Sequence, residues 1–298
     1  MSQTYQIPAL GLGTWQSKEE VVYKAVLTAL DVGYRHIDTA FSYGNEVAVG
    51  QAIKDSGVAR SELFVTTKLA PIDMVCVEKA LNKSLKNLGL DYVDLYLMHW
   101  PVALNPENTS HPLLPTLANG KRDILFDRSF VSTYVDMQSL VVSGKAKSIG
   151  VSNMSIKNLR TLLGSKDVTV KPVVNQVELH PYLPQNELLE YCKRENIILE
   201  AYSPLGSTDS PLLKDKTLGE LASKYTTTIA NILISWAVWR GTVVLPKSST
   251  PSRIASNFEI VKLSDEDGEI IDKVSKTMGT KRFINPDWDP VVVFNDIE

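Results

Sequence analysis

The chain has 298 residues, of which 44% are hydrophobic and 22% are charged, and its formal net charge is −3. This is the composition of a folded globular protein, and without a run of basic residues neither nucleic acid nor a membrane surface is predicted as a partner. The chain shows no secretory leader and no stretch of about 18 apolar residues, so we expect a cytoplasmic protein, either a monomer or a weak dimer.

Short apolar runs rich in β-branched residues alternate with amphipathic segments along the chain. This alternation is typical of repeated βα units and a parallel sheet. Eight runs are predicted as strands: Leu10–Trp15, His36–Asp38, Leu63–Leu69, Val93–Trp100, Ser148–Ser152, Val173–Leu179, Ile198–Ser203 and Val243–Lys247. Eight such units predict an α/β fold, a (β/α)8 TIM barrel, formed by residues 1–298 as one domain.

Two predicted helix starts agree with this alternation of strands and helices. Ser17-Lys18-Glu19-Glu20 predicts a capping box, and Ser264 precedes the acidic turn Asp265-Glu266-Asp267. The segment before Leu10 is short, so we expect the β-hairpin that plugs the bottom of the barrel to be reduced in size.

Two segments without periodicity are expected over the C-terminal face of the barrel, where TIM barrels bind ligands. The first, 101–127, contains four prolines and is predicted to be a lid loop. The second, 280–298, carries aromatic residues and is predicted to be a C-terminal loop over the active site.

Cys76 and Cys192 are the only cysteines, and neither has a second Cys or His at ligand spacing. We therefore expect two reduced thiols and no metal site.

Polar residues stand at the C-terminal ends of the predicted strands. Asp38, Lys68 and His99 end three adjacent strands, and Tyr43 lies in the turn after Asp38. Individually, Asp38 could cap a helix, Lys68 could be solvated and His99 could be a core residue. Their predicted convergence favours a catalytic site instead.

The motifs around these residues resemble those of the aldo-keto reductase superfamily over nearly the whole chain. They are Gly33-Tyr34-Arg35-His36-Ile37-Asp38-Thr39-Ala40, Tyr43-Gly44-Asn45-Glu46, Val93-Asp94-Leu95-Tyr96-Leu97-Met98-His99-Trp100-Pro101, Gly150-Val151-Ser152-Asn153, Asn175-Gln176-Val177-Glu178-Leu179-His180-Pro181 and Leu245-Pro246-Lys247-Ser248 with Arg253 and Asn257. The branch that looks nearest is that of fungal glycerol dehydrogenases and keto-ester reductases, near aldose reductase.

The resemblance implies NADPH-dependent reduction of aldehydes and ketones to alcohols, with Asp38, Tyr43, Lys68 and His99 as the catalytic tetrad. Such a reaction needs a hydride from the nicotinamide and a proton for the carbonyl oxygen. Tyr43 is the natural proton donor, and a Lys68 ammonium held by Asp38 would lower the pKa of Tyr43 from about 10 toward working pH. His99 would orient the carbonyl by a hydrogen bond.

No Gly-x-Gly-x-x-Gly motif follows the first strand, so a Rossmann cofactor site is not supported. The resemblance implies an extended NADPH across the barrel mouth, with Ser152, Asn153 and Gln176 on the carboxamide and Tyr202 stacked on the nicotinamide. Lys247 and Arg253, near a predicted helix N-terminus, favour a 2′-phosphate and hence NADPH over NADH. The other residues implied in cofactor binding are Gly13, Thr14, Trp15, Asp38, Ser203, Leu205, Ser207, Ser248, Ser249, Thr250 and Asn257. Ser256 stands where family members often carry a Glu that contacts adenine, which leaves the adenine contacts open.

The expected substrate is a small carbonyl compound such as an aldehyde, a keto ester, a dicarbonyl or a polyol-derived carbonyl. Candidates for the pocket wall are Trp15, Tyr43, His99, Trp100, Phe126 and Trp288. The sequence shows no clustered basic pocket, which argues against highly anionic substrates. Two alternatives remain open: a cofactor-binding regulatory or structural barrel without turnover, and an aldolase in which Lys68 forms a Schiff base.

Overall fold

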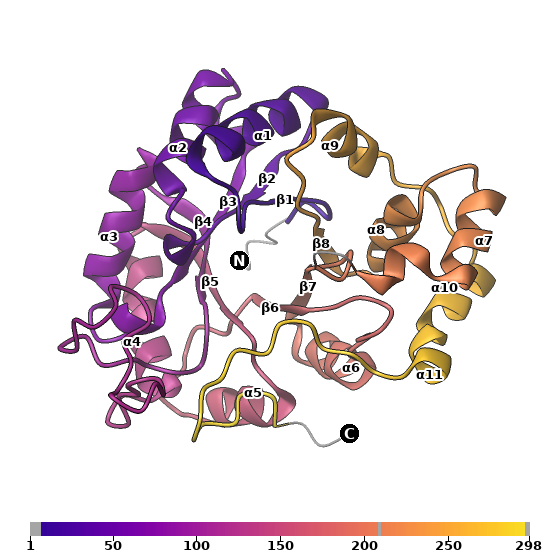
Figure 1. The fold of residues 1–298 in the computed structure, drawn as a ribbon. Coiled ribbons are helices and arrows are strands. Elements are labelled where there is room, and N and C mark those ends of the chain that lie inside the picture. The colour runs from indigo at the N-terminus through magenta and orange to yellow at the C-terminus, as the bar shows by residue number, and fades with distance from the viewer. Residues whose placement is uncertain (1–6, 208–209, 296–298) are drawn as a thin grey trace.

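Eight parallel strands pair in sequence order in a computed structural model of the chain, which describes residues 7–207 and 210–295 (Figure 1). The strands are β1 (Leu12–Gly13), β2 (His36–Asp38), β3 (Phe64–Leu69), β4 (Val93–Met98), β5 (Ala146–Ser152), β6 (Val174–Glu178), β7 (Ile198–Tyr202) and β8 (Val243–Leu245). Backbone hydrogen bonds from Gly11 N to Val244 O (2.9 Å) and from Val244 N to Ala9 O (2.8 Å) join the first strand to the last. The predicted (β/α)8 barrel is therefore confirmed.

The helices surround the sheet (Figure 1). They are α1 (Glu19–Val32), α2 (Glu46–Asp55), α3 (Val77–Leu88), α4 (Phe130–Val142), α5 (Ile156–Leu163), α6 (Asn186–Glu195), α7 (Lys216–Lys224), α8 (Ile229–Trp239), α9 (Pro251–Phe258), α10 (Asp265–Asp272) and α11 (Val274–Met278). Short 3-10 helices are η1 (Phe41–Tyr43), η2 (Arg60–Glu62), η3 (Pro71–Asp73) and η4 (Pro211–Lys214).

Helix α3 illustrates how the sequence produces this arrangement. Val77, Leu81, Leu85 and Leu88 recur at helical spacing and are buried, so one apolar stripe packs inward. Each such leucine contributes roughly 1.5–3 kcal/mol through burial. The helix ends at Gly89, whose left-handed φ of 64° is a conformation that glycine adopts without a steric penalty.

Both predicted helices begin where expected, but only one of the two predicted side-chain caps is confirmed. Ser264 caps α10, because its hydroxyl oxygen accepts a hydrogen bond from Asp267 N. Helix α1 has Lys18 at its N-cap, and no side chain caps it. The carbonyl of Ser17 accepts instead from Asn45 Nδ2 (3.0 Å), which ties Ser17 to the loop after β2.

Residues 101–127 fold back on themselves through an antiparallel bridge between Leu104 and Ile124. Val102, Leu104, Trp288 and Val293 form a separate buried cluster that joins this segment to the tail. The ammonium of Lys121 also pairs with Asp289. The two segments predicted to cover the barrel thus pack against each other, and their function as a lid stays a prediction.

The expected reduction of the N-terminal hairpin concerns residues 1–6, which lie outside the described part of the chain. Across residues 7–207 and 210–295, no helix combines the length and apolarity needed to cross a membrane. The same ranges contain no group of three or more His, Cys, Asp and Glu placed to hold a metal ion.

Candidate active site

The C-terminal ends of β2, β3 and β4 bring three candidate residues to one place. Asp38 is the last residue of β2, Lys68 lies near the end of β3, and His99 directly follows β4. Asp38 pairs in register with Thr66, so Lys68, two residues further along, extends on the same face of the sheet. Tyr43 ends η1, the short helix after β2.

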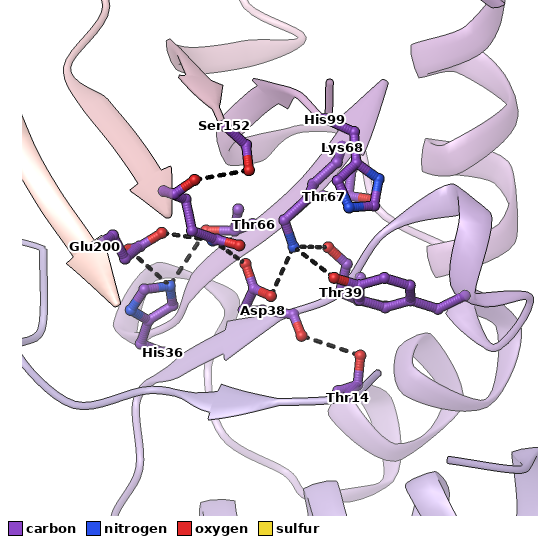
Figure 2. A network of polar contacts seen from close by, with 12 residues as sticks. Thr14, His36, Asp38, Thr39, Thr66, Thr67, Lys68, His99, Ser152 and Glu200 are labelled. Carbon is purple, nitrogen blue, oxygen red and sulfur yellow. Dashed lines mark hydrogen bonds and ion pairs between the residues drawn. The ribbon is translucent and has the colours of Figure 1, made fainter. Parts of the chain in front are cut away.

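The buried ammonium of Lys68 connects the acid to the phenol. Its Nζ donates to Asp38 Oδ1 (2.7 Å), to the carbonyl oxygen of Thr39 (2.9 Å) and to the Tyr43 hydroxyl (3.3 Å; Figure 2). The rings of Tyr43 and His99 are 5.7 Å apart between centroids. The four predicted side chains therefore form one constellation.

Lys68 and His99 have pKa values that fix their charges at neutral pH. Burial by itself would lower the pKa of Lys68, but Asp38 and Tyr43 together outweigh burial and leave the pKa raised. Burial and the nearby Lys68 ammonium hold the pKa of His99 well below 6.5. Lys68 is thus a cation and His99 a neutral imidazole, whose Nδ1 is buried without a hydrogen-bond partner in the described structure.

The pKa of Tyr43 departs from the sequence-based expectation. Lys68 does lower it, as expected, yet burial of the phenol has the larger effect and leaves the pKa of Tyr43 raised above 10.0. The expected shift toward working pH is therefore wrong for the protein alone. Tyr43 is instead held protonated, which is the state that a proton donor needs.

Asn153 organises the opposite side of the barrel mouth. Its Nδ2 donates to the carbonyl of His99 (3.0 Å) and to Ser152 Oγ (3.1 Å), and its Oδ1 accepts from the Tyr202 hydroxyl (2.8 Å). Ser152 Oγ donates to the backbone carbonyl of Gln176 (2.8 Å). These bonds fix the Tyr202 ring beside the cavity before any ligand arrives.

Basic residues after β8 flank the start of α9. Lys247 and Arg253 line the cavity, and between them the helix begins at Pro251 with Thr250 as its N-cap. Pro suits a first helical position, and the free N–H groups of a first turn favour an anion. Ser256 donates its hydroxyl hydrogen to Asn231 Oδ1 (3.2 Å), so it is held away from the cavity.

A cavity of about 720 Å³ opens above the tetrad. The predicted site residues that line it are Trp15, Asp38, Tyr43, His99, Trp100, Asn153, Gln176, Tyr202, Ser203, Leu205, Ser207, Lys247, Arg253 and Trp288. Those that do not line it are Gly13, Thr14, Lys68, Ser152, Ser248, Ser249, Thr250, Asn257 and Phe126. The largest discrepancy is Phe126, which we expected in the pocket wall but which is 71% exposed.

The expectation of no basic cluster is also wrong. Arg122, Lys214, Lys247 and Arg253 line this one cavity, although they come from three different segments. Because Arg122 and Lys214 lie far from Lys247 and Arg253 in the sequence, no run of basic residues could reveal the group of four. The cavity therefore offers cations to an anionic substrate, contrary to the expectation from the sequence.

Sequence reasoning missed two buried acids in the strands. Glu200 in β7 and Glu178 in β6 are both inaccessible to solvent. Glu200 accepts from Gln176 Nε2 (2.7 Å), and Glu178 accepts from the backbone N atoms of Phe283 (2.7 Å) and Ile284 (2.8 Å). Glu200 lies inside an otherwise apolar strand, and this is itself a signal, because buried carboxyl groups need partners.

Known proteins resemble this chain in sequence and in fold. The sequence pattern of the aldo/keto reductase family matches residues 9–276. A glycerol 2-dehydrogenase (NADP(+)) from Saccharomyces cerevisiae is 55% identical over 97% of this chain and 94% of its own length. An aldehyde reductase from the same yeast is 49% identical, with coverage of 97% and 94%. The solved structure of an aldose reductase from Giardia lamblia is similar with a TM-score of 0.90 and 35% identity, covering 97% of this chain and 98% of that one.

Proposed function

Because the chain belongs to the aldo/keto reductase family, we propose that it reduces aldehydes and ketones to alcohols with NADPH. The substrate class includes keto esters, dicarbonyls and polyol-derived carbonyls. The observation that carries the proposal is the contact of Lys68 Nζ with both Asp38 and the Tyr43 hydroxyl at the base of the cavity.

The roles of the four side chains follow from their charges and contacts. Tyr43, held protonated, gives its hydroxyl proton to the carbonyl oxygen as negative charge develops there. Lys68 stabilises the tyrosinate that remains, and Asp38 keeps Lys68 charged and in place. Neutral His99 donates a hydrogen bond that orients the carbonyl oxygen. NADPH supplies the hydride when bound.

The residues around the cavity fit such a cofactor. Lys247 and Arg253 form no ion pair with any described residue, so both are available for a phosphate. The Tyr202 ring offers an aromatic face for the nicotinamide, and Gln176 and Asn153 offer amide groups for its carboxamide. The yeast glycerol 2-dehydrogenase has NADP(+) in its name, which supports the same choice of cofactor.

The aldolase alternative does not fit the state of Lys68. A Schiff-base lysine must be a free amine, and burial in an apolar pocket or a neighbouring cation lowers its pKa. Here the Asp38 carboxylate raises the pKa of Lys68 and holds its ammonium at 2.7 Å. Lys68 is therefore a cationic partner of Tyr43.

One panel of assays tests the proposal. NADPH absorbance is followed with aldehydes, keto esters, dicarbonyls and polyol-derived carbonyls, each repeated with NADH. Turnover with NADPH on at least one class supports the proposal. Tight NADPH binding with no turnover on any class would instead identify a regulatory or structural barrel.

A further inference from the structure

The side-chain amide of Gln176 lies between two carboxyl groups inside the barrel. Its Nε2 donates to Asp38 Oδ2 (2.8 Å) and to Glu200 Oε2 (2.7 Å), so both N–H groups are used. Gln176 and Glu200 are register partners on β6 and β7. Figure 2 shows Glu200 on the far side of this network from Lys68 and His99, with Asp38 between them.

These two bonds determine which way the amide faces. A rotation by 180° would place the amide oxygen against the Asp38 carboxylate, which has no hydrogen to donate, and leave Asp38 Oδ2 without its donor. The carbonyl oxygen of Gln176 is therefore left for the cavity, which Gln176 lines. Asp38 takes one N–H and Glu200 takes the other, so the amide is held at both of its hydrogens.

The surroundings of Glu200 suit a neutral acid. Burial and the nearby Asp38 carboxylate raise the pKa of Glu200 to about 8, against opposing effects of Gln176 and Lys68. His36 Nε2 lies 3.9 Å from Glu200 Oε1, and burial lowers the pKa of His36 to about 4, so this neighbour is neutral. Glu200 can thus accept from Gln176 at neutral pH without placing a second full charge beside Asp38.

We propose that Glu200 is a positioning residue, which holds the Gln176 amide so that its carbonyl oxygen accepts a hydrogen bond from the carboxamide NH₂ of a bound nicotinamide. This inference rests on the proposed function, because it requires NADPH in the cavity. It assigns to Glu200 an effect on the nicotinamide half of the cofactor and none on the phosphate half.

The test measures binding of two ligands to three proteins. NADPH is compared with adenosine 2′,5′-bisphosphate, which carries the 2′-phosphate but no nicotinamide. The proteins are the wild type, Glu200→Met, which keeps side-chain length but removes the acceptor, and Glu200→Gln, whose amide oxygen restores it. Glu200→Thr, too short to reach Gln176, replaces Glu200→Met if that variant does not fold.

The acceptor-less variant should bind NADPH about tenfold more weakly, as for one hydrogen bond, and should bind the bisphosphate as the wild type does. Glu200→Gln should recover most of the NADPH affinity. Equal losses for both ligands, or unchanged NADPH affinity, overturn the positioning role and leave Glu200 as a structural residue. If the wild type binds the bisphosphate but not NADPH, the proposed function fails first, and the inference fails with it.

Discussion

Tyr43 and His99 meet edge to face, with ring centroids 5.7 Å apart and ring planes at 74°. Tyr43→Phe preserves this contact and removes only the hydroxyl that Lys68 Nζ approaches at 3.3 Å. Loss of a general acid reduces turnover by about 10²- to 10⁴-fold, so we expect kcat for carbonyl reduction to fall in that range. NADPH affinity, measured by quenching of tryptophan fluorescence, should remain unchanged.

Tyr23→Phe is the matched control, because the Tyr23 hydroxyl donates to Asp55 Oδ2 on the helical surface. Its turnover should equal that of the wild type. If Tyr43→Phe also turned over at nearly the normal rate, Tyr43 would not be the proton donor.

The pH dependence of turnover follows from the pKa shifts of the same two residues. Burial holds the pKa of His99 well below 6.5 and raises the pKa of Tyr43 above 10.0. Neither group changes protonation across the neutral range. Reduction should therefore show no step in kcat/KM near pH 6.5, and it should decline at alkaline pH as Tyr43 loses its proton.

This profile is measured with Glu200→Gln beside the wild type, because the pKa of Glu200 is about 8 and its ionisation could add a step of its own. A step near pH 8 should be absent from that variant. An acidic limb centred near pH 6.5 in both proteins would show that His99 titrates in its ordinary range, contrary to its buried environment.

Cofactor preference is expected to depend on Arg253 and Lys247, which line the cavity around the start of α9. Removing a charged hydrogen-bonding partner costs about 1.5–3 kcal/mol, which corresponds to roughly ten- to a hundredfold in affinity. Arg253→Ala should weaken NADPH binding by that factor and leave NADH binding nearly unchanged. Titration calorimetry with both cofactors measures the ratio.

Arg194→Ala is the control for charge, since Arg194 is an exposed residue in the last turn of α6. It should change neither affinity. A parallel loss for NADPH and NADH in Arg253→Ala would mean that Arg253 binds a group common to both cofactors, such as the pyrophosphate.

Local patterns predicted the strands and the residues that end them. Runs such as Val93–Met98 are apolar at every position except Asp94 because parallel strands are covered on both faces, and this burial leaves a readable signal. A barrel brings the ends of such strands to one face, so Asp38, Lys68 and His99 could be grouped before any coordinates were known.

Contacts made by closure of the barrel and by irregular segments could not be predicted in this way. The bond between Gln176 and Glu200 depends on the register of β6 and β7, which no pattern in either strand specifies. Phe126 points to solvent while Trp288 is buried against Trp100, because the path of residues 101–127 is set by long-range packing. Aromatic composition alone does not distinguish these two outcomes.

Glu178 connects the strand ends to the tail. Its carboxylate accepts from Phe283 N, from Ile284 N and from His180 Nε2 (2.9 Å), and Ile284 and Pro286 line the cavity. Glu178→Gln replaces a charged acceptor by an amide with only one acceptor oxygen, so its N–H₂ group faces the donor or donors on the other side. We expect a loss of about 1.5–3 kcal/mol in the free energy of unfolding in urea, and a higher KM for aromatic aldehydes with a smaller change in kcat.

The pH dependence of this loss in unfolding free energy distinguishes the charge of the Glu178 carboxylate from the packing of its side chain. Burial would raise the pKa of Glu178, but the bonds from His180, Phe283 and Ile284 outweigh it and leave the pKa below 4.5. The folded state therefore gains stability from ionised Glu178 above pH 4.5, and this gain disappears as the pH falls through the lower folded-state pKa. The stability gap between the wild type and Glu178→Gln should narrow in acid, whereas exposed Glu62→Gln should show a negligible gap at every pH. A gap that stayed constant into acid would show that shape, and not charge, holds the tail at the cavity.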